Sequence, residues 1–217
     1  MNKTVVLLSG GIDSATCLWW AKKKKWDIYT ISFNYFNRTK RETRAVELLL
    51  DQVDVIQHKD VEISFLKDIE DLMKLNFNVS NKLTKFPSAY IPSRNLIFYG
   101  LAASWAESIG AKWIVGGHHK LDFDLFPDST PEFFKLLNEL LRIGTWISKK
   151  NTLKIIRPLE TLNKYDVLKL ALKLKVPLHL TWSCYQGGVK PCEKCDACIK
   201  RKEAFDIMKL SDPLYEY

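Results

Sequence analysis

The residues best suited to chemistry stand near the start of the chain, in the run Ser9-Gly10-Gly11-Ile12-Asp13-Ser14. Two adjacent glycines let a backbone adopt dihedral angles that other residues avoid, so its N–H groups can approach an anion. Ser9 and Ser14 add hydroxyl donors, and a helix after the loop would add the N–H groups of its first turn. We expect Asp13 to hold Mg²⁺ or to orient the loop. The run predicts a phosphate-binding loop; a tight strand-to-helix turn is the alternative.

The loop is not a Walker A loop, because the Lys-Ser/Thr pair after the second glycine is missing. We assign the nucleotide contacts to the run and its immediate neighbours. These residues are Leu8, Ser9, Gly10, Gly11, Ile12, Asp13, Ser14, Ala15 and Thr16.

Four of the five cysteines lie close together near the other end of the chain: Cys184, Cys192, Cys195 and Cys198. The C-x2-C spacing chelates a metal, and four thiolates form a closed tetrahedral zinc site with no open position for water. An iron–sulfur cluster uses the same ligands, and a redox pair is a further alternative. Nearby basic residues leave a nucleic-acid-binding zinc ribbon open as well: Lys190, Lys194, Lys200, Arg201 and Lys202. Cys17 stands alone and is expected to be a small buried residue.

These groups must be positioned by elements that alternate along the chain. Apolar runs predict strands at 4–8, 27–34, 53–57, 112–115 and 153–156, and amphipathic runs predict helices at 14–24, 38–50, 93–108, 131–146 and 163–174. We expect Gly110 to end the third helix, and Thr161 or Asn163 to cap the last. The alternation predicts an α/β fold with a doubly wound, Rossmann-like parallel sheet. Residues 60–89 show no clear period and are interpreted as an insertion that covers the site.

Ligands bind beyond the carboxyl ends of the strands in such sheets. We therefore expect function in the loops at 9–14, 34–38 and 116–131 and near Arg157-Pro158. We divide the chain into a nucleotide-binding domain, residues 1–180, and a small zinc-binding module, residues 181–217.

Further runs carry a family resemblance together with the phosphate loop and the cysteines. They are Tyr90-Ile91-Pro92-Ser93-Arg94-Asn95, Pro158-Leu159 followed by Lys164, and Thr181-Trp182-Ser183-Cys184-Tyr185. Over residues 5–205 the chain resembles the 7-cyano-7-deazaguanine synthase family of the PP-loop ATP pyrophosphatase superfamily. The resemblance implies an adenine nucleotide alpha hydrolase-like fold.

The resemblance also implies an ATP-dependent carbon–nitrogen ligase. The carboxylate of 7-carboxy-7-deazaguanine would attack the α-phosphate of ATP, ammonia would displace AMP to give an amide, and a second adenylation would give the nitrile. The product would be 7-cyano-7-deazaguanine, a precursor of queuosine and archaeosine. The implied cofactors are Mg²⁺ and Zn²⁺. The implied catalytic residues are Ser9, Asp13, Ser14, Arg94 and Lys164, and the implied substrate contacts are Arg38, Arg94, Asn95, His119, Asp122 and Asp128.

The loop at 117–133 departs from the family pattern. Asp122 and Asp128 match it, but His119 replaces an Asn, and Ser129-Thr130 replaces a Cys-Arg pair. The lost arginine bears on how the substrate carboxylate is recognised. We expect His118 and His119 to contact phosphate or substrate rather than a metal, because adjacent residues of a strand point to opposite sides.

The bulk composition is that of an ordinary globular protein, with 47% hydrophobic residues and a net charge of +8. No run is long enough to cross a bilayer and no secretory signal is visible, so we expect a cytoplasmic protein without a membrane partner. The charge keeps two alternatives open: adenylation of a tRNA base or attachment of a deazaguanine to a macromolecule, and a non-enzymatic nucleotide or nucleic-acid binding module. We expect a homodimer, whose interface Trp19, Trp20 and Trp146 would line unless they belong to the core.

Overall fold

The computed structural model describes residues 2–36, 38–69, 71, 90–147 and 153–215. All site residues expected from the sequence lie within these ranges. Most of the expected insertion at 60–89 lies outside them, so its covering role stays a prediction.

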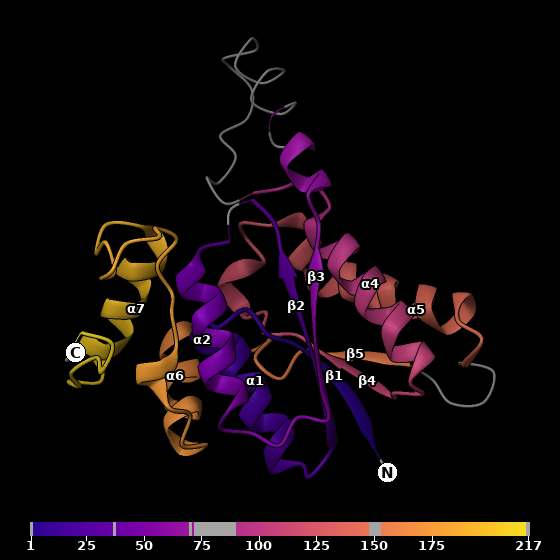
Figure 1. Cartoon of the computed structure of the whole chain (residues 1–217), viewed down its shortest axis with the longest axis horizontal. Coiled ribbons are helices and arrows are strands. Elements are labelled where there is room, and N and C mark those ends of the chain that lie inside the picture. The colour runs from indigo at the N-terminus through magenta and orange to yellow at the C-terminus, as the bar shows by residue number, and fades with distance from the viewer. Residues whose placement is uncertain (1, 37, 70, 72–89, 148–152, 216–217) are drawn as a thin grey trace.

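A sheet of five parallel strands forms the centre of the molecule (Figure 1). The strands are β1 (Lys3–Leu7), β2 (Asp27–Asn34), β3 (Gln57–Glu62), β4 (Trp113–Val115) and β5 (Lys154–Ile156), in the order β3-β2-β1-β4-β5. The chain moves outward from β1 to β3 and then returns to the other side of β1. Because the order reverses between β1 and β4, the loops after these two strands diverge and leave room for a ligand.

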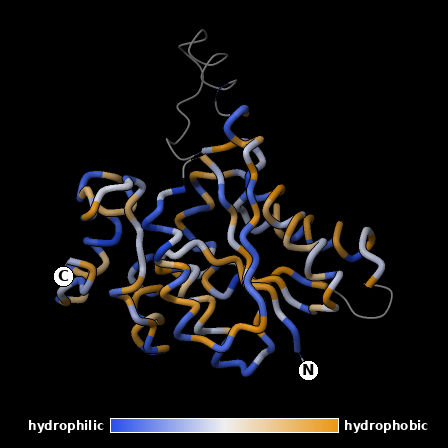
Figure 2. Tube along the Cα trace, viewed as in Figure 1, coloured by the Kyte–Doolittle hydropathy of each residue, from blue (hydrophilic) through white to orange (hydrophobic). Residues whose placement is uncertain are grey.

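Helices cover both faces of the sheet, which confirms the doubly wound α/β fold. One layer contains α1 (Ile12–Lys23), α2 (Lys40–Leu50), α6 (Lys164–Lys173) and α7 (Asp196–Ile207); the other contains α4 (Arg94–Ser108) and α5 (Pro131–Gly144) (Figure 1). Each layer has its own apolar cluster, and Figure 2 shows the apolar segments concentrated in the strands and the helices beside them. Val5 and Val6 illustrate the division, because these neighbours in β1 belong to opposite clusters.

Local capping explains where several helices begin. Thr39 accepts a hydrogen bond from the backbone N–H of Glu42, whose carboxylate accepts one from Thr39 N–H in return. Thr130 caps α5 ahead of Pro131, and Asn163 caps α6, one of the two residues expected to do so. Gly110, with φ of +69°, follows the end of α4 as predicted.

Strand β3 is not where the sequence pattern placed it. The predicted strand at 53–57 was wrong: the structure has a strand at Gln57–Glu62. It lies at the edge of the sheet and pairs with β2. Charged side chains suit an edge, since they discourage pairing with another chain, and they erase the apolar signal. The apolar residue Val53 is buried in the core from a loop.

The C-terminal segment packs against the first helical layer. Ala204 and Phe205 of α7, an element that the sequence pattern did not predict, belong to the same core cluster as α1. The division at residues 180 and 181 stays a prediction. Cys17 is fully buried, as expected. None of the helices in the described ranges has the length and apolarity that a membrane span needs.

Candidate functional site

The loop between β1 and α1 is shaped by its glycines and serines. Gly10 adopts a φ of +92°, and a Cβ atom there would lie 2.7 Å from the carbonyl oxygen of Glu42, so only glycine fits. The Ser14 hydroxyl lies 3.1 Å from both the backbone nitrogen and the hydroxyl of Ser9, and donates to Gly11 O at 3.0 Å. Helix α1 begins at Ile12, and its first intrahelical hydrogen bond runs from Ala15 N to Gly11 O. The N–H groups of Ile12, Asp13 and Ser14 are therefore available to an anion.

Asp13 in the first turn of α1 pairs with a lysine from the far end of the chain. Lys164 Nζ lies 2.7 Å from both carboxylate oxygens of Asp13. His119 Nε2 lies 3.9 Å from Asp13 and 3.8 Å from Asp122. Burial acts to raise the pKa of Asp13, but Lys164 and His119 outweigh it, so the pKa lies below its usual value. Burial raises the pKa of Asp122 against the opposing effect of His119. The site therefore holds one firmly ionised carboxylate beside one that ionises less readily.

A cavity of about 420 Å³ opens over this loop at the carboxyl ends of the strands. Most of the residues predicted for the site line it, although they come from five separate segments. They are Leu8, Ser9, Gly11, Ile12, Asp13, Ser14, Arg38, Arg94, Asn95, His119, Asp122 and Lys164. Gly10, Ala15, Thr16 and Asp128 are not among its lining residues. The Thr16 hydroxyl donates back to Ile12 O at 2.7 Å within α1.

Arg38 brings unused donors to the cavity. Its Nη1 donates to Phe33 O at 2.9 Å, while Nε and Nη2 are buried and find no hydrogen-bond partner in the described part of the chain. Burial lowers the pKa of Arg38, and the nearby carboxylates of Glu42 and Asp60 oppose that effect. A guanidinium with two free donors in a cavity suits a carboxylate or a phosphate.

Asp128 caps the start of α4. Its Oδ2 accepts from Asn95 N at 2.9 Å, and Asn95 Nδ2 donates to Asp128 O and to the Ser129 hydroxyl, both at 3.0 Å. Ser93, the residue before α4, has φ of +53° and makes no side-chain cap. Asp128 thus provides from 33 residues away the capping acceptor that Ser93 does not. Its expected contact with a substrate stays a prediction.

Two further residues line the cavity: His118, which was expected to contact phosphate or substrate, and Tyr99, which the sequence did not single out. Tyr99 fits because residue 116 is glycine: a Cβ atom there would lie 1.7 Å from the Tyr99 hydroxyl oxygen. His118 lies among aromatic rings, 5.0 Å from Phe134 between ring centroids. Burial, with the charges of Arg157 and Arg94, lowers the pKa of His118 to about 3. A neutral imidazole therefore faces the cavity at neutral pH.

His118 and His119 both line the cavity, contrary to the alternation expected of a strand, because β4 ends at Val115 and the loop after it is not bound by that alternation.

The cavity also has an aromatic wall. Phe33 and Phe98 stack with their ring centroids 4.2 Å apart and an interplanar angle of 14°. Such a wall suits a flat heteroaromatic ring. Arg157, expected near the site, pairs with Glu160 at 2.5 Å and lies 4.4 Å from the ring centroid of Phe134, next to His118.

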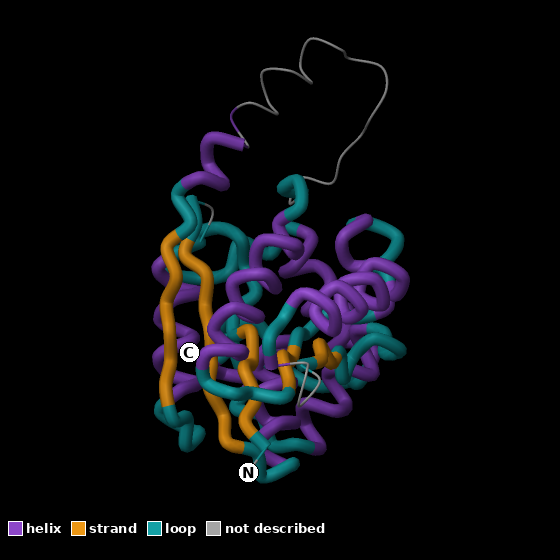
Figure 3. Tube along the Cα trace, turned by 90° about the vertical axis from the view of Figure 1, so that its right-hand side faces the viewer, coloured by secondary structure: helices purple, strands orange, loops and turns teal. Residues whose placement is uncertain are grey.

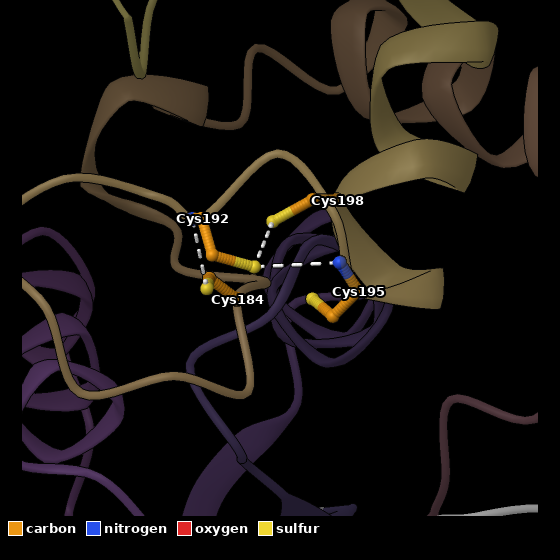
Figure 4. Close-up of side chains that lie close together, drawn as sticks. All are labelled: Cys184, Cys192, Cys195 and Cys198. Atoms are coloured by element: carbon orange, nitrogen blue, oxygen red, sulfur yellow. Dashed lines mark hydrogen bonds between the residues drawn. The ribbon is translucent and has the colours of Figure 1, made fainter.

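The four cysteines gather as the spacing predicted (Figure 4). Their Sγ atoms all lie within 4.8 Å of one another, and those of Cys192 and Cys198 are 3.9 Å apart. Four thiolates around zinc, at Zn–S of about 2.3 Å, would stand about 3.8 Å apart. The Sγ of Cys184 accepts from Gln186 N and Cys192 N, both at 3.3 Å. These sulfurs therefore fit a metal. No other group of three or more candidate ligands occurs among the described residues.

The cysteine-bearing segment forms part of the cavity. Trp182 N donates to Gly10 O at 2.9 Å, which joins the segment to the phosphate loop. Ser183, Tyr185 and Lys200 line the cavity, although the sequence assigned them no contact. Arg201, counted among the basic residues around the cysteines, is only 1% exposed and pairs with Asp212. It is therefore unavailable to a nucleic acid, which weakens the zinc-ribbon alternative.

The chain is similar to known proteins over nearly its whole length. A model of the family described as "Queuosine biosynthesis protein QueC" matches residues 3–209. The 7-cyano-7-deazaguanine synthase of Oceanobacillus iheyensis is 38% identical over 217 residues, which cover 98% of this chain and 97% of that protein. The synthase of the same name from Thermoplasma volcanium is 37% identical over 218 residues, covering 98% and 90%.

Among solved structures, a 4-thiouridine synthetase in complex with RNA and bound ATP aligns with a TM-score of 0.54 and 20% identity. The alignment covers 94% of this chain and 53% of that one. At this identity the likeness concerns the fold alone, and it agrees with the expected α/β fold.

Proposed function

The chain belongs to the QueC family of queuosine biosynthesis proteins, and from that membership we propose that it converts 7-carboxy-7-deazaguanine and ammonia to 7-cyano-7-deazaguanine with ATP. The observation that carries the proposal is the arrangement around the β1–α1 loop. A glycine-built anion site, four cationic side chains and an aromatic wall face one cavity. That cavity can hold a triphosphate together with a flat anionic substrate.

The first step joins the two anions. A carboxylate oxygen of the substrate attacks the α-phosphorus of ATP, the bond to pyrophosphate breaks, and an acyl adenylate forms. Arg38, Arg94 and Lys164 offset the negative charge of both reactants, and Ser9, Ser14 and the loop N–H groups are donors for the phosphate oxygens. Because these donors are already in place, little reorganisation is needed as charge develops.

The later steps exchange oxygen for nitrogen. Ammonia attacks the acyl carbon, AMP leaves, and the nitrogen loses a proton. Asp122 and His119 line the cavity close together and are the groups suited to accept that proton. The amide oxygen then attacks the α-phosphorus of a second ATP, and pyrophosphate leaves. Loss of AMP, which carries away the former amide oxygen, and of both amide protons gives the nitrile. Asn95 and the neutral His118 are the hydrogen-bonding groups suited to the deazapurine edge.

Mg²⁺ would neutralise phosphate charge in such a reaction, but the described residues do not form a cage for it. Both oxygens of Asp13 are engaged by Lys164. We therefore expect Mg²⁺ to arrive with the triphosphate, as it usually does in nucleotide sites. The role of Asp13 is to hold Lys164 beside the loop.

Zn²⁺ is the metal that we assign to Cys184, Cys192, Cys195 and Cys198, because four thiolates at tetrahedral spacing form a closed structural site. We also place the chain in the cytoplasm, where free thiols persist, and propose that it acts as a homodimer without requiring tRNA.

The decisive experiment incubates the purified protein with ATP, Mg²⁺, ammonium and 7-carboxy-7-deazaguanine and follows products by mass spectrometry. The nitrile, AMP and pyrophosphate are expected. Lys164→Met should lower kcat/KM by at least about 100-fold, because it removes a charge aimed at the reacting phosphates. Lys169→Met, an exposed neighbour on α6, is the matched control and should retain activity. Failure of the zinc-loaded wild-type protein to form the nitrile would refute the proposal.

A further inference from the structure

Four lysines surround a groove that is separate from the cavity over the phosphate loop. The groove has a volume of about 500 Å³ and lies where α1 and α6 end. Lys22 and Lys23 belong to the last turn of α1, and Lys173 and Lys175 stand at the end of α6. All four side chains are exposed, and no carboxylate of the described residues lines the groove. We call it the lysine groove; its other lining residues are Trp19, Gln52, Leu174 and Pro177.

The lysine groove lies at the edge of the sheet opposite the cavity. Figure 3 shows the strands side by side, with the N-terminus at the edge where they begin. Helix α1 starts at the phosphate loop and runs back to this edge, where β2 begins with Asp27. Its 12 residues place the two ends of the helix about 18 Å apart. A ligand in the lysine groove therefore leaves the cavity free.

The positive charge of the lysine groove is largely unbalanced. Lys22 Nζ donates to Gln52 O at 3.0 Å, but none of the four lysines forms an ion pair with a carboxylate of the described residues. The carbonyl ends of α1 and α6 offset about half a charge each, so roughly three of the four positive charges remain. Because like charges that lie close together repel, an anion in the groove relieves this repulsion.

The floor and rim of the lysine groove indicate a small ligand with a chain of phosphates. Its volume lies within the range of small-molecule sites. Lysine ammonium groups are compact point charges that suit phosphate oxygens, and Leu174 and Pro177 offer apolar surface to a nucleoside. A nucleic-acid strand would stack its bases on exposed aromatic rings. Trp19, the aromatic residue of the groove, belongs to the core and is only 7% exposed.

The two helices that end at the lysine groove begin at the phosphate loop. Asp13 lies in the first turn of α1, Lys164 is the first residue of α6, and the two side chains pair at 2.7 Å. The helices pack against each other and lie next to each other in Figure 1. An anion that joins their far ends therefore holds together the same two helices that the ion pair joins at the cavity.

We propose that the lysine groove is a second polyphosphate site, which binds the phosphate chain of a nucleoside triphosphate or of a free polyphosphate. The bound chain neutralises the four ammonium groups and connects the ends of α1 and α6. This site goes beyond the proposed function, because its occupant takes no part in the reaction in the cavity.

The test counts binding sites on the whole chain by equilibrium dialysis with a labelled, non-hydrolysable ATP analogue. Wild type should bind two analogues per chain. Lys175→Gly should raise the dissociation constant of one site by at least about fivefold, because one ammonium group is lost. This variant should fold, since glycine suits the φ of +60° at this position. Lys209→Gly is the matched control: Lys209 has a φ of +54° after α7 and does not line the groove, so both sites should keep their affinity.

Inorganic tripolyphosphate distinguishes the two sources of the phosphate chain. If it displaces the analogue from the Lys175-dependent site as well as ATP does, the phosphates alone are recognised; if it displaces the analogue less well, the nucleoside contributes. Both results support the proposal. Circular dichroism checks that each variant is folded.

The proposal is overturned if no site up to about 1 mM analogue is weakened more by Lys175→Gly than by Lys209→Gly. Displacement by an RNA duplex but not by tripolyphosphate overturns it as well, in favour of a nucleic acid. Nitrile formation is assayed separately. An inactive protein with a Lys175-dependent site would refute the proposed function alone, and an active protein without that site would refute the second site alone.

Discussion

Replacing Arg201 tests how the cysteine-bearing segment is held against the phosphate loop. Its guanidinium forms a two-pronged pair with Asp212, Nε–Oδ2 at 2.6 Å and Nη2–Oδ1 at 2.8 Å. The same group donates to the Thr181 hydroxyl at 2.9 Å. The next residue, Trp182, donates from its backbone N–H to Gly10 O at 2.9 Å. Arg201 therefore connects α7 and the end of the chain to the turn that faces the cavity.

The expected loss follows from burial. The side chains of Arg201 and Asp212 are 1% and 6% exposed, so Arg201→Met leaves a carboxylate buried without its cation. Removing one partner of a buried ion pair costs about 3–5 kcal/mol. In a chain of this length each kcal/mol lowers Tm by about 2–4 °C, so we expect a fall of roughly 6–20 °C. Arg201→Lys keeps the charge but loses the planar fork, and should fall between the variant and wild type.

Urea unfolding followed by circular dichroism, together with thermal melting, measures this loss. Lys202→Met, an exposed neighbour on α7, is the matched control and should change the free energy of unfolding by no more than about 0.5 kcal/mol. Arg201→Met should also bind ATP more weakly than Lys202→Met, because the support of Gly10 is lost. A loss below about 1 kcal/mol, or equal ATP affinity in the two variants, would refute the reasoning.

Three further outcomes are expected. Cys195→Ser should lose zinc and lower the free energy of unfolding by several kcal/mol, since metal binding at a closed site is folding free energy; full metal content with unchanged melting would contradict this. Folding lowers the pKa of His118 to about 3, so as the pH falls the unfolded chain is protonated at this residue before the folded chain is. The free energy of unfolding should therefore fall by about 1.4 kcal/mol per pH unit below about pH 6.5. His118→Phe should remove that component of the pH dependence. Lys175→Gly should stabilise the fold by about 0.5–1 kcal/mol because Lys175 has a φ of +60°, whereas Lys173→Gly, within α6, should destabilise it.

The parts of the fold that could be predicted depend on local signals. An apolar strand followed by two glycines fixed the position of the phosphate loop, and Asn163 marked the start of α6. Gly110 marked the end of α4 because glycine tolerates its φ of +69°. Lys25, Lys175 and Lys209 have the same backbone conformation at the ends of α1, α6 and α7. Nothing in the lysine side chain indicates this conformation, so the left-handed residue after each of these helices could not be predicted. The apolar pattern nevertheless placed the ends of α1 and α6 within one residue.

The parts that could not be predicted depend on contacts between distant residues. The cap that Asp128 gives to α4 joins residues 33 positions apart, and no local pattern links them. Arg201 stood in a run of basic residues, so its sequence context favoured a solvated or anion-binding role. Its burial becomes apparent only once Asp212 is placed beside it. Asp13 and Lys164 pair across 151 residues. Each was predicted as a site residue, but nothing in the sequence predicted that they contact each other.

Several cavity groups are costly to the folded protein as it stands. Two nitrogens of Arg38, the Tyr99 hydroxyl and Nδ1 of His119 are buried and find no hydrogen-bond partner within the described ranges. A buried donor of this kind costs about 1–3 kcal/mol when neither protein, water nor ligand accepts its hydrogen bond. All three side chains line the one cavity that the phosphate loop faces. A ligand rich in acceptors would satisfy the donors and recover part of that energy on binding. The donors that the protein leaves open therefore give the cavity its selectivity for an anionic, hydrogen-bonding substrate.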